Sequence, residues 1–239
     1  MRRDIFINVS PFEKRIALLE DGRLTELVVD KPDNQRIVGN IYKGRVVSVL
    51  PGMQAAFVDI GLEKAAFLHA ADVAVADEGD FDDDADDDVD PRRRDRAEKP
   101  IDQLLREGQE ILVQVVKEPI STKGAKVTGY LSIAGRFLVC MPNTAFIGVS
   151  KKSRDHGSRR KLKRLVQDLR RSPDVGYIVR TNGLNESEDE FRVEMGILEE
   201  KWAFIKSVAS ECEAPRLVLE ENEAAVGILR DYFSEKVDK

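Results

Sequence analysis

Apolar and polar positions alternate along the first thirty residues of the chain. One alternating run covers positions 5–9, and two more apolar runs cover 16–19 and 24–29. A proline follows the first run, and an Asp-Gly pair lies between the second and the third. Short runs bounded by turn-forming residues are typical of antiparallel strands joined by tight turns. The sequence therefore predicts a three-stranded meander over residues 4–29.

Five more short runs, rich in β-branched residues, follow between residues 39 and 128. Turn-forming glycines and prolines punctuate this region. Short strands at this spacing are typical of a small β-barrel such as the OB-fold. The predicted strands cover residues 41–49, 55–60, 65–68, 111–116 and 125–128.

The region from Gly135 to about Ser210 combines two short strands with two helices. The strands are expected at 137–140 and 177–181. The first helix is basic: its apolar residues recur at helical spacing, which leaves lysine and arginine outside, and Ser158 is its expected N-cap. The longer second helix carries an apolar stripe, interpreted as a core contact rather than a base-stacking surface: Phe191, Met195, Leu198, Trp202, Ile205 and Ala209.

The end of the chain predicts one more strand at 216–219 and a helix from about 222 to 233. No partner strand follows this helix. Two interpretations remain open: the segment completes the sheet begun by the meander, or the chain stops within a domain.

Charge is strongly segregated along the chain. The 239 residues carry a net charge of −6. An acidic tract covers residues 77–90, and a basic stretch covers residues 151–171. The segment from about 76 to 100 has too few apolar residues to offset its ordering entropy, so it is predicted to be a disordered surface loop. A metal site there is disfavoured, because a hard cation needs ligands held by a scaffold.

Several classes of protein are disfavoured by what the sequence contains. Cys140 and Cys212 are far apart and outside any CxxC motif, so both are expected to be reduced structural thiols. His69 and His156 lie in no recognisable nucleophile motif. No run approaches the roughly 20 apolar residues of a membrane span, and no signal-type stretch opens the chain. A cytoplasmic location without a membrane span is therefore expected.

Strand alternation directs Phe57 and Phe67 outward from two neighbouring strands of the expected barrel. Exposed rings on such a sheet stack bases of single-stranded RNA, at about 1–3 kcal/mol for each base. Candidate phosphate contacts near that face are Lys43, Arg45 and Lys123. From these residues alone, an alternative is equally good: both phenylalanines cap a core that packs against another domain instead of binding RNA. The outward set of the first strand is expected to be Ala55, Phe57 and Asp59, and the inward set Ala56, Val58 and Ile60.

Many segments, in order along the chain, resemble the RNase E/G family of endoribonucleases. The barrel segments alone are shared by many RNA-binding proteins, whereas the stretch 131–181 is more specific to this family. The resembling segments are 40–46 (NIYKGRV), 55–61, 66–68, 106–110, 113–115, 123–125, 131–139, 141–143, 148–150 and 178–181, with the Lys201-Trp202 pair.

The resemblance implies an α+β fold in which an S1-type OB-fold barrel is inserted into an RNase H-like subdomain and followed by an α/β region called the 5′ sensor. The RNase H-like part is expected to serve as a scaffold, because its first strand carries no carboxylate at positions 5–9. The implied boundaries are 1–35 for the first RNase H-like part, 36–128 for the barrel, 129–212 for the sensor and 213–239 for the start of the remaining RNase H-like part.

The resemblance also implies roles for individual residues. Stacking of RNA falls to Phe57 and Phe67, and backbone contact to Lys123. A 5′-terminal monophosphate is implied to bind Arg180 and Thr181, because a guanidinium grips phosphate through two parallel hydrogen bonds and a hydroxyl adds a donor. Gly135 and Val139 are implied to line this pocket and Lys151 to support it, although the family often has arginine at the last position.

The implied function is that of the RNA-binding, 5′-monophosphate-sensing part of a single-strand-specific endoribonuclease of RNA decay and rRNA processing. The family is homo-oligomeric, cleaves with magnesium held by aspartates, and binds zinc through a cysteine pair. Both metal sites are expected beyond Lys239, so this chain alone is expected to be inactive. The alternative is a stand-alone S1-type regulatory protein that binds single-stranded RNA without catalysis.

Overall fold

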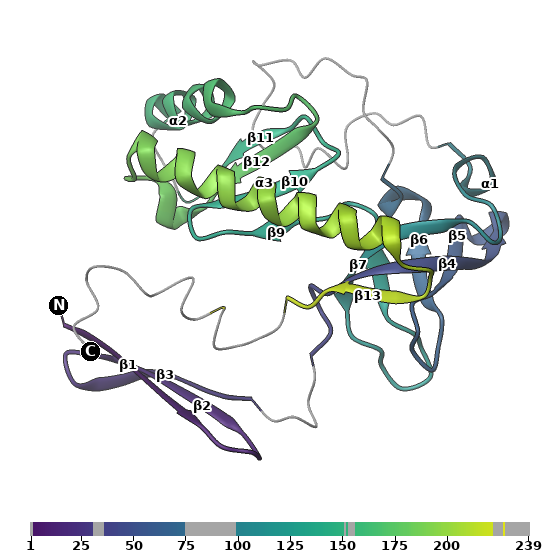
Figure 1. Ribbon diagram of the computed structural model, residues 1–239, viewed down its shortest axis with the longest axis horizontal. Helices are drawn as coiled ribbons and strands as arrows, with labels where there is room; N and C mark the ends of the chain where they lie inside the picture. Colours follow the sequence, from purple (N-terminus) through teal and green to yellow (C-terminus); the bar gives the residue numbers. More distant parts are fainter. Residues whose placement is uncertain are drawn as a thin grey trace. The chain divides into compact units, whose positions relative to one another are not determined.

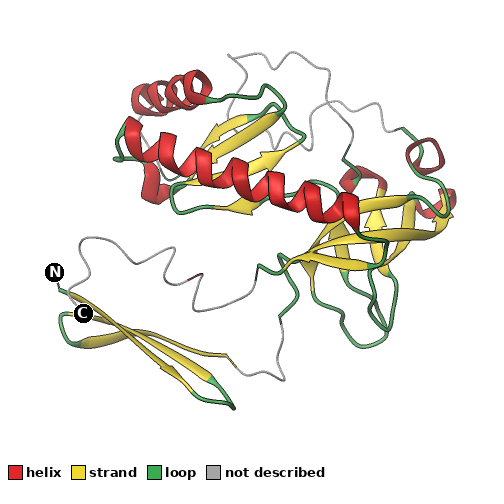
Figure 2. Ribbon diagram, in the orientation of Figure 1, coloured by secondary structure: helices red, strands yellow, loops and turns green. Residues whose placement is uncertain are grey.

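The computed structural model describes residues 2–30, 36–74, 99–150, 152, 156–221 and 227. The chain divides into two compact units, residues 1–37 with 220–239 and residues 38–219. Strands and helices of each unit are labelled in Figure 1 and coloured by type in Figure 2.

A three-stranded antiparallel sheet forms the described part of the first unit. Its strands are β1 (Arg3–Val9), β2 (Lys14–Glu20) and β3 (Arg23–Asp30), in that order. Asp21 and Gly22 form the two-residue turn between β2 and β3, with φ angles of 49° and 77°. A turn with two positive φ angles matches the twist of paired strands, and Asp-Gly is suited to it. The predicted meander is confirmed.

A closed barrel opens the second unit. Its five strands are β4 (Ile41–Leu50), β5 (Ala55–Asp59), β6 (Ala66–His69), β7 (Glu110–Lys117) and β8 (Lys126–Thr128). They are paired in the order β4-β5-β6-β8-β7, and a further pairing of β4 with β7 closes the ring. Only β6 and β8 run parallel among these pairs. All five predicted strands are confirmed, and the barrel is OB-like.

Side chains directed inward fill this barrel. Val46, Val58, Leu68 and Val113 are each at most 1% exposed. Gly44 is needed because a Cβ there would lie 2.5 Å from Cγ1 of Val58. Three short helical segments flank the strands: η2 (Pro51–Met53), η3 (Ala70–Asp72) and α1 (Ile101–Leu104).

The rest of the second unit is a four-stranded sheet with two helices. The strands β9 (Ile133–Ala134), β10 (Leu138–Pro142), β11 (Ile147–Val149) and β12 (Val175–Val179) are paired in the order β11-β12-β10-β9. The helices are α2 (His156–Leu169) and α3 (Glu188–Glu211), and a single turn, η5 (Thr181–Gly183), follows β12.

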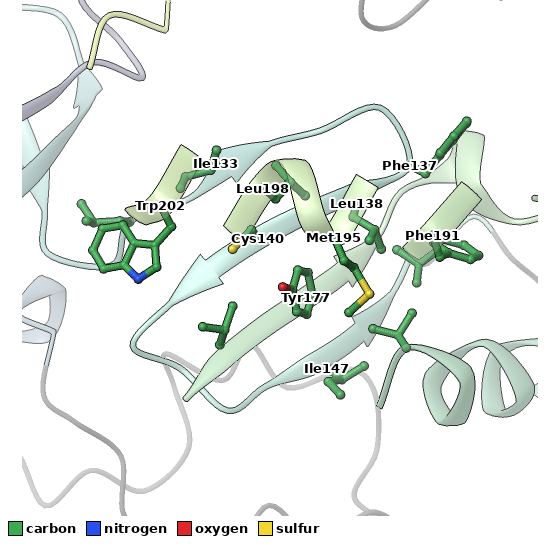
Figure 3. Packing of buried hydrophobic residues seen from close by; sticks show 14 of the residues in the cluster. Ile133, Phe137, Leu138, Cys140, Ile147, Tyr177, Phe191, Met195, Leu198 and Trp202 are labelled. Carbon is green, nitrogen blue, oxygen red and sulfur yellow. The ribbon is translucent and has the colours of Figure 1, made fainter. Parts of the chain in front are cut away.

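Helix α3 lies along this sheet and continues to the barrel (Figure 1). Its N-cap is Ser187, whose hydroxyl accepts a hydrogen bond from the Glu190 backbone N–H at 3.3 Å. Its buried stripe faces the strands, as Figure 3 shows for Met195 and Leu198 near Cys140 and Tyr177. The predicted core contact is therefore confirmed, with Phe191, Met195, Leu198, Trp202 and Ile205 all buried.

The strand predicted at 216–219 is present, but it does not complete the sheet begun by the meander. β13 (Arg216–Leu219) pairs antiparallel with β4, so it is a sixth strand of the barrel's sheet. The sequence could not indicate this pairing, because the partner strand lies more than 160 residues away and no local pattern specifies it. The helix expected at 222–233 falls outside the described residues, Gly227 excepted.

One local prediction was wrong. Helix α2 begins at His156, so Ser158 lies inside its first turn and is not the N-cap. Ala55, expected on the same strand face as Phe57, is fully buried, because alternation sets the direction of a side chain but not what covers it. The acidic loop expected at 76–100 lies outside the described residues except for Lys99 and Pro100.

Candidate nucleic-acid interface

Two aromatic rings stand side by side on the outer face of the barrel. Phe57 of β5 and Phe67 of β6 are direct partners in the strand register. Their ring centroids are 6.1 Å apart and the ring planes meet at 70°. Both side chains are half-buried, while Ala56, Val58 and Leu68 between them point into the core. The pair therefore presents a partly exposed aromatic surface.

Lysines surround one end of this surface. Lys126 of β8 is the register partner of Phe67, and its Nζ lies 2.9 Å from an Asp72 carboxylate oxygen. Lys123 is exposed in the bend before β8, where its backbone is bridged to that of Ile120. Lys64, also exposed, donates from Nζ to the Ser121 carbonyl at 2.9 Å. Sequence analysis identified Lys123 but missed Lys64 and Lys126, because only the pairing of β6 with β8 brings them together.

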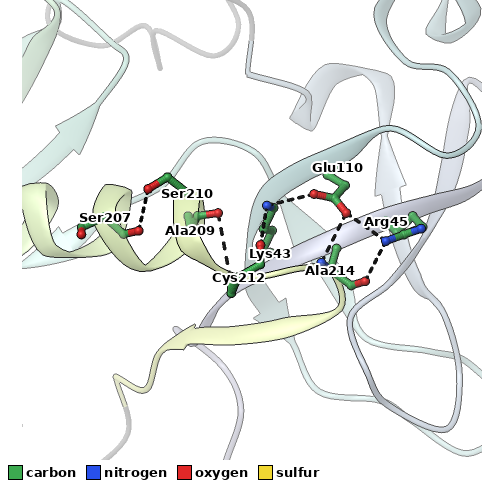
Figure 4. A network of polar contacts seen from close by, with 8 residues as sticks. All are labelled: Lys43, Arg45, Glu110, Ser207, Ala209, Ser210, Cys212 and Ala214. Carbon is green, nitrogen blue, oxygen red and sulfur yellow. Dashed lines mark hydrogen bonds and ion pairs between the residues drawn. The ribbon is translucent and has the colours of Figure 1, made fainter.

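Lys43 and Arg45 have partners inside the protein. Glu110 lies between them, with its carboxylate oxygens 2.9 Å from Lys43 Nζ and 2.9 Å from Arg45 Nη2 (Figure 4). Lys43 also donates to the Cys212 carbonyl at 2.7 Å, and Arg45 to the Ala214 carbonyl at 3.0 Å. The hydrogen bond from Lys43, more than any other contact, holds the pKa of Glu110 below its usual range. These cations join the barrel to the segment between α3 and β13, which makes them weaker candidates for phosphate contacts.

A second group of predicted residues gathers beyond the end of β12. Arg180 follows this strand, and its backbone N–H donates to the Phe137 carbonyl at 2.7 Å. Its Nη1 donates to the Gly135 carbonyl at 2.6 Å. The hydroxyl of Thr181 lies 3.0 Å from the hydroxyl of Ser150, which follows β11. Because β11 and β10 both pair with β12, residues from three strand ends meet here.

The other residues predicted for this pocket have mixed outcomes. Val139 is paired with Ile178 of β12, and both are half-buried, unlike their neighbours Leu138 and Val179, which are fully buried. Gly135 has no room for a side chain, because a Cβ would lie 2.9 Å from the Glu194 carboxyl group. Lys151 lies outside the described residues. The structure therefore brings Gly135 and Val139 near Arg180 but leaves the support by Lys151 untested.

Glu194 was missed by the sequence analysis. It projects from α3 and accepts hydrogen bonds from the backbone N–H groups of Arg136, Phe137 and Leu138. Burial raises the pKa of this carboxyl, and the three N–H donors and the Arg180 charge oppose that rise. A signal was present in the sequence: position 194 lies three residues after Phe191 and four before Leu198, so a charged residue interrupts an apolar stripe.

Two kinds of feature are absent from the described residues. Among them, no group of three or more His, Cys, Asp or Glu side chains is arranged to hold a metal ion. No helix in the described part of the chain is both long and apolar enough to cross a membrane.

The fold and these side chains define a class of protein, in which an OB-like barrel with a paired aromatic surface is joined to an α/β layer that carries Arg180 and Thr181 at the end of β12. Residues 132–239 match the model of the Ribonuclease E/G family. The chain is 41% identical over 238 residues to ribonuclease G of Haemophilus influenzae, covering 99% of this chain and 46% of that protein. Ribonuclease G of Escherichia coli is 36% identical over 244 residues, covering 100% and 47%.

Ribonuclease E of Escherichia coli is 32% identical over 238 residues, which is 99% of this chain and 21% of that protein. The chain belongs to the ribonuclease E/G family. It spans about half the length of the ribonucleases G that it matches.

Proposed function

We propose that this chain binds single-stranded RNA and senses a 5′-terminal monophosphate as part of a single-strand-specific endoribonuclease. The observation that carries the proposal is the register-paired Phe57 and Phe67 on an OB-like barrel of a ribonuclease E/G family member. In this proposal the barrel is of the S1 type, the first unit is an RNase H-like scaffold, and the four-stranded sheet is the 5′ sensor.

Stacking supplies the sequence-tolerant part of binding. Every base has a flat π-face, so two partly exposed rings accept successive bases of any sequence. The exposed lysines at the end of the rings, Lys64 and Lys123, provide positive charge where the RNA backbone leaves the stack, whereas Lys126 is paired with Asp72. A duplex is excluded because its bases are already stacked on each other.

The sensor recognises the chemistry of the RNA end. A terminal phosphate monoester carries up to two negative charges and three acceptor oxygens. The bond from Arg180 Nη1 to the Gly135 carbonyl holds one N–H of the guanidinium, and the next residue, Thr181, is exposed. A 5′-hydroxyl end lacks the charge that such a pocket favours.

The bond-breaking step is assigned to residues outside these 239. The proposed enzyme acts in RNA decay and rRNA processing in the cytoplasm, as a homo-oligomer. Magnesium is its proposed catalytic metal, which supplies an activated water for phosphodiester hydrolysis, and zinc is its proposed structural metal.

The test is a binding titration with a short single-stranded RNA that carries either a 5′-monophosphate or a 5′-hydroxyl. We expect tighter binding of the monophosphate, and Arg180→Ala removes this difference. Arg192→Ala is the control, because Arg192 is an exposed arginine of α3 paired with Glu188. Equal affinity of the wild-type protein for the two RNAs rejects the sensor.

The aromatic surface is tested separately. Phe57→Ala and Phe67→Ala each weaken binding of both RNAs, by roughly five- to 150-fold, since one stacked base contributes about 1–3 kcal/mol. Phe204→Ala is the matched control, because Phe204 is an exposed aromatic residue of α3. Incubation with RNA and magnesium is expected to give no cleavage. Cleavage that disappears in Phe57→Ala places catalytic residues inside this chain and contradicts the proposal.

A further inference from the structure

Three consecutive backbone N–H groups converge on one carboxylate in the turn between β9 and β10. Oε1 of Glu194 accepts from Arg136 N at 2.5 Å. Oε2 accepts from Phe137 N at 2.9 Å and from Leu138 N at 2.8 Å. Successive N–H groups that point into one concavity form an anion-binding site. The anion in this one is part of the protein.

The carbonyl groups of the same turn are held by Arg180. Its guanidinium donates to the Gly135 carbonyl at 2.6 Å, and its backbone N–H donates to the Phe137 carbonyl at 2.7 Å. Gly135 N–H also donates to the Leu138 carbonyl at 2.8 Å, which closes the turn. Glu194 therefore binds the N–H groups, and Arg180 the carbonyl groups, of one four-residue loop.

A carboxylate at position 194 is unfavourable for the stability of the fold. Its neighbours on the stripe, Phe191, Met195 and Leu198, are buried and apolar (Figure 3). A carboxylate removed from water is disfavoured unless its hydrogen bonds are complete. An apolar residue would continue the stripe, but it would leave three N–H groups without this partner and the turn without its anchor.

We propose that Glu194 is a positioning residue of the 5′-phosphate sensor: it holds the turn from Gly135 to Leu138 so that the Gly135 carbonyl orients the Arg180 guanidinium toward a terminal phosphate monoester. This inference rests on the proposed function. The carboxylate does not touch the RNA. It acts through the backbone of the turn. The hydrogen bonds of Glu194 hold the turn in place, and the turn then orients the positively charged Arg180 side chain.

The geometry predicts that charge and length at position 194 both matter. Glu194→Gln keeps the size of the side chain but turns one acceptor oxygen into an NH2 group, which points at an N–H. Glu194→Asp keeps the charge and shortens the reach by one methylene. Either change releases part of the turn, and Arg180 then loses a fixed partner. The exposed carboxylate of Glu200, on the same helix, offers the same chemistry without these contacts.

The experiment uses the full 239-residue chain and one single-stranded RNA with either a 5′-monophosphate or a 5′-hydroxyl end. The readout is the ratio of the two dissociation constants. We expect Glu194→Gln to reduce the monophosphate advantage by about five- to tenfold, the size of a lost charge-assisted contact. Affinity for the hydroxyl RNA stays within about twofold, because stacking on the barrel is untouched. Glu200→Gln, the control, changes neither value.

The possible outcomes separate the inference from the function on which it rests. A wild-type ratio of one removes the sensor and this inference together. A wild-type advantage that survives unchanged in Glu194→Gln overturns only the role of Glu194. If Glu194→Gln weakens binding of both RNAs equally, Glu194 has only a structural role, and the proposed positioning role is overturned. Thermal melts verify folding, and if Glu194→Gln fails to fold, Glu194→Asp is used instead and is expected to retain part of the advantage.

Discussion

Arg180 donates a hydrogen bond of 2.6 Å from its guanidinium to the carbonyl of Gly135, a residue 45 positions earlier in the chain. Both residues are proposed parts of the phosphate sensor. The bond restricts the orientation of the planar guanidinium, since it holds one of the N–H groups in place. The proposed site therefore depends on the turn that contains Gly135 as much as on the arginine.

Replacement of Gly135 by alanine is expected to disturb this turn. The new Cβ would lie 2.9 Å from the Glu194 carboxyl group and 3.0 Å from the Leu138 carbonyl oxygen. We expect a loss of about 1–3 kcal/mol in the free energy of unfolding, the range for an overpacked site. The monophosphate advantage in RNA binding falls as well. Urea titration and the two-RNA assay measure the two effects, and an unchanged midpoint contradicts the packing argument.

Gly196 provides the opposite case. It lies inside α3, and a Cβ there meets no atom within 4 Å. Alanine loses less backbone entropy than glycine when it enters a helix. We therefore expect Gly196→Ala to raise the free energy of unfolding by roughly 0.5–1 kcal/mol. Urea titration tests this, and a destabilised variant shows that the position has a role in packing.

The stability of Glu194→Gln relative to the wild type is expected to depend on pH. Burial raises the pKa of Glu194 in the folded protein above its unfolded value. The stability that this group contributes is therefore complete below the unfolded pKa and is lost as pH rises through the folded pKa. Glutamine does not titrate.

The free energy of unfolding of Glu194→Gln minus that of the wild type is thus expected to increase from pH 4 upward, since the unfolded carboxyl titrates near a pKa of about 4.3. Urea titrations at a series of pH values measure this difference, and Glu200→Gln serves as the control. A difference that decreases over the same range shows that the three N–H donors outweigh burial.

The two cysteines are expected to react at different rates with a thiol reagent. Burial raises the pKa of Cys140 to about 12, so almost no thiolate forms at pH 8. Cys212 is only partly buried. We expect one thiol to react quickly in the native protein and the second only after unfolding. Cys212→Ser removes the fast phase, and a fast phase that remains indicates that Cys140 is accessible.

Salt dependence tests the lysines beside the aromatic pair. For single strands the slope of log K against log salt changes by about 0.7 for each phosphate contact. We expect Lys123→Ala to reduce the slope by about that amount. Lys206→Ala is the control, because Lys206 lies over the Trp202 ring on α3. An unchanged slope in Lys123→Ala removes Lys123 from the RNA path.

Much of the local structure was predictable, because it is specified by neighbouring residues. Period-two runs located the barrel strands, and the spacing of Phe191, Met195 and Leu198 located the buried face of α3. The outward direction of Phe57 and Phe67 followed from the same alternation. Their register pairing required the tertiary structure, because it depends on how two strands align.

The candidate site was less predictable, because its contacts also join residues that are far apart in the sequence. Lys43 and Arg45 are cations near the expected face, yet Glu110 and two carbonyls of a segment 169 residues away engage them. Glu194 has no motif, and its three partners lie 56 to 58 residues earlier. Electrostatic and hydrogen-bond partners are set by distance in space, which a linear pattern does not encode.

The sequence by itself determined which segments are strands and helices, which faces are apolar, and which family the chain resembles, since these depend on short-range periodicity and on local motifs. Only the tertiary structure decided that β4 closes on β7, that β13 joins the barrel, and that Glu194 and Arg180 both bind one turn, Glu194 at its N–H groups and Arg180 at its carbonyl groups. The physical reason is that pairing, burial of charge and orientation of a guanidinium depend on long-range contacts, and these exist only once the chain has folded.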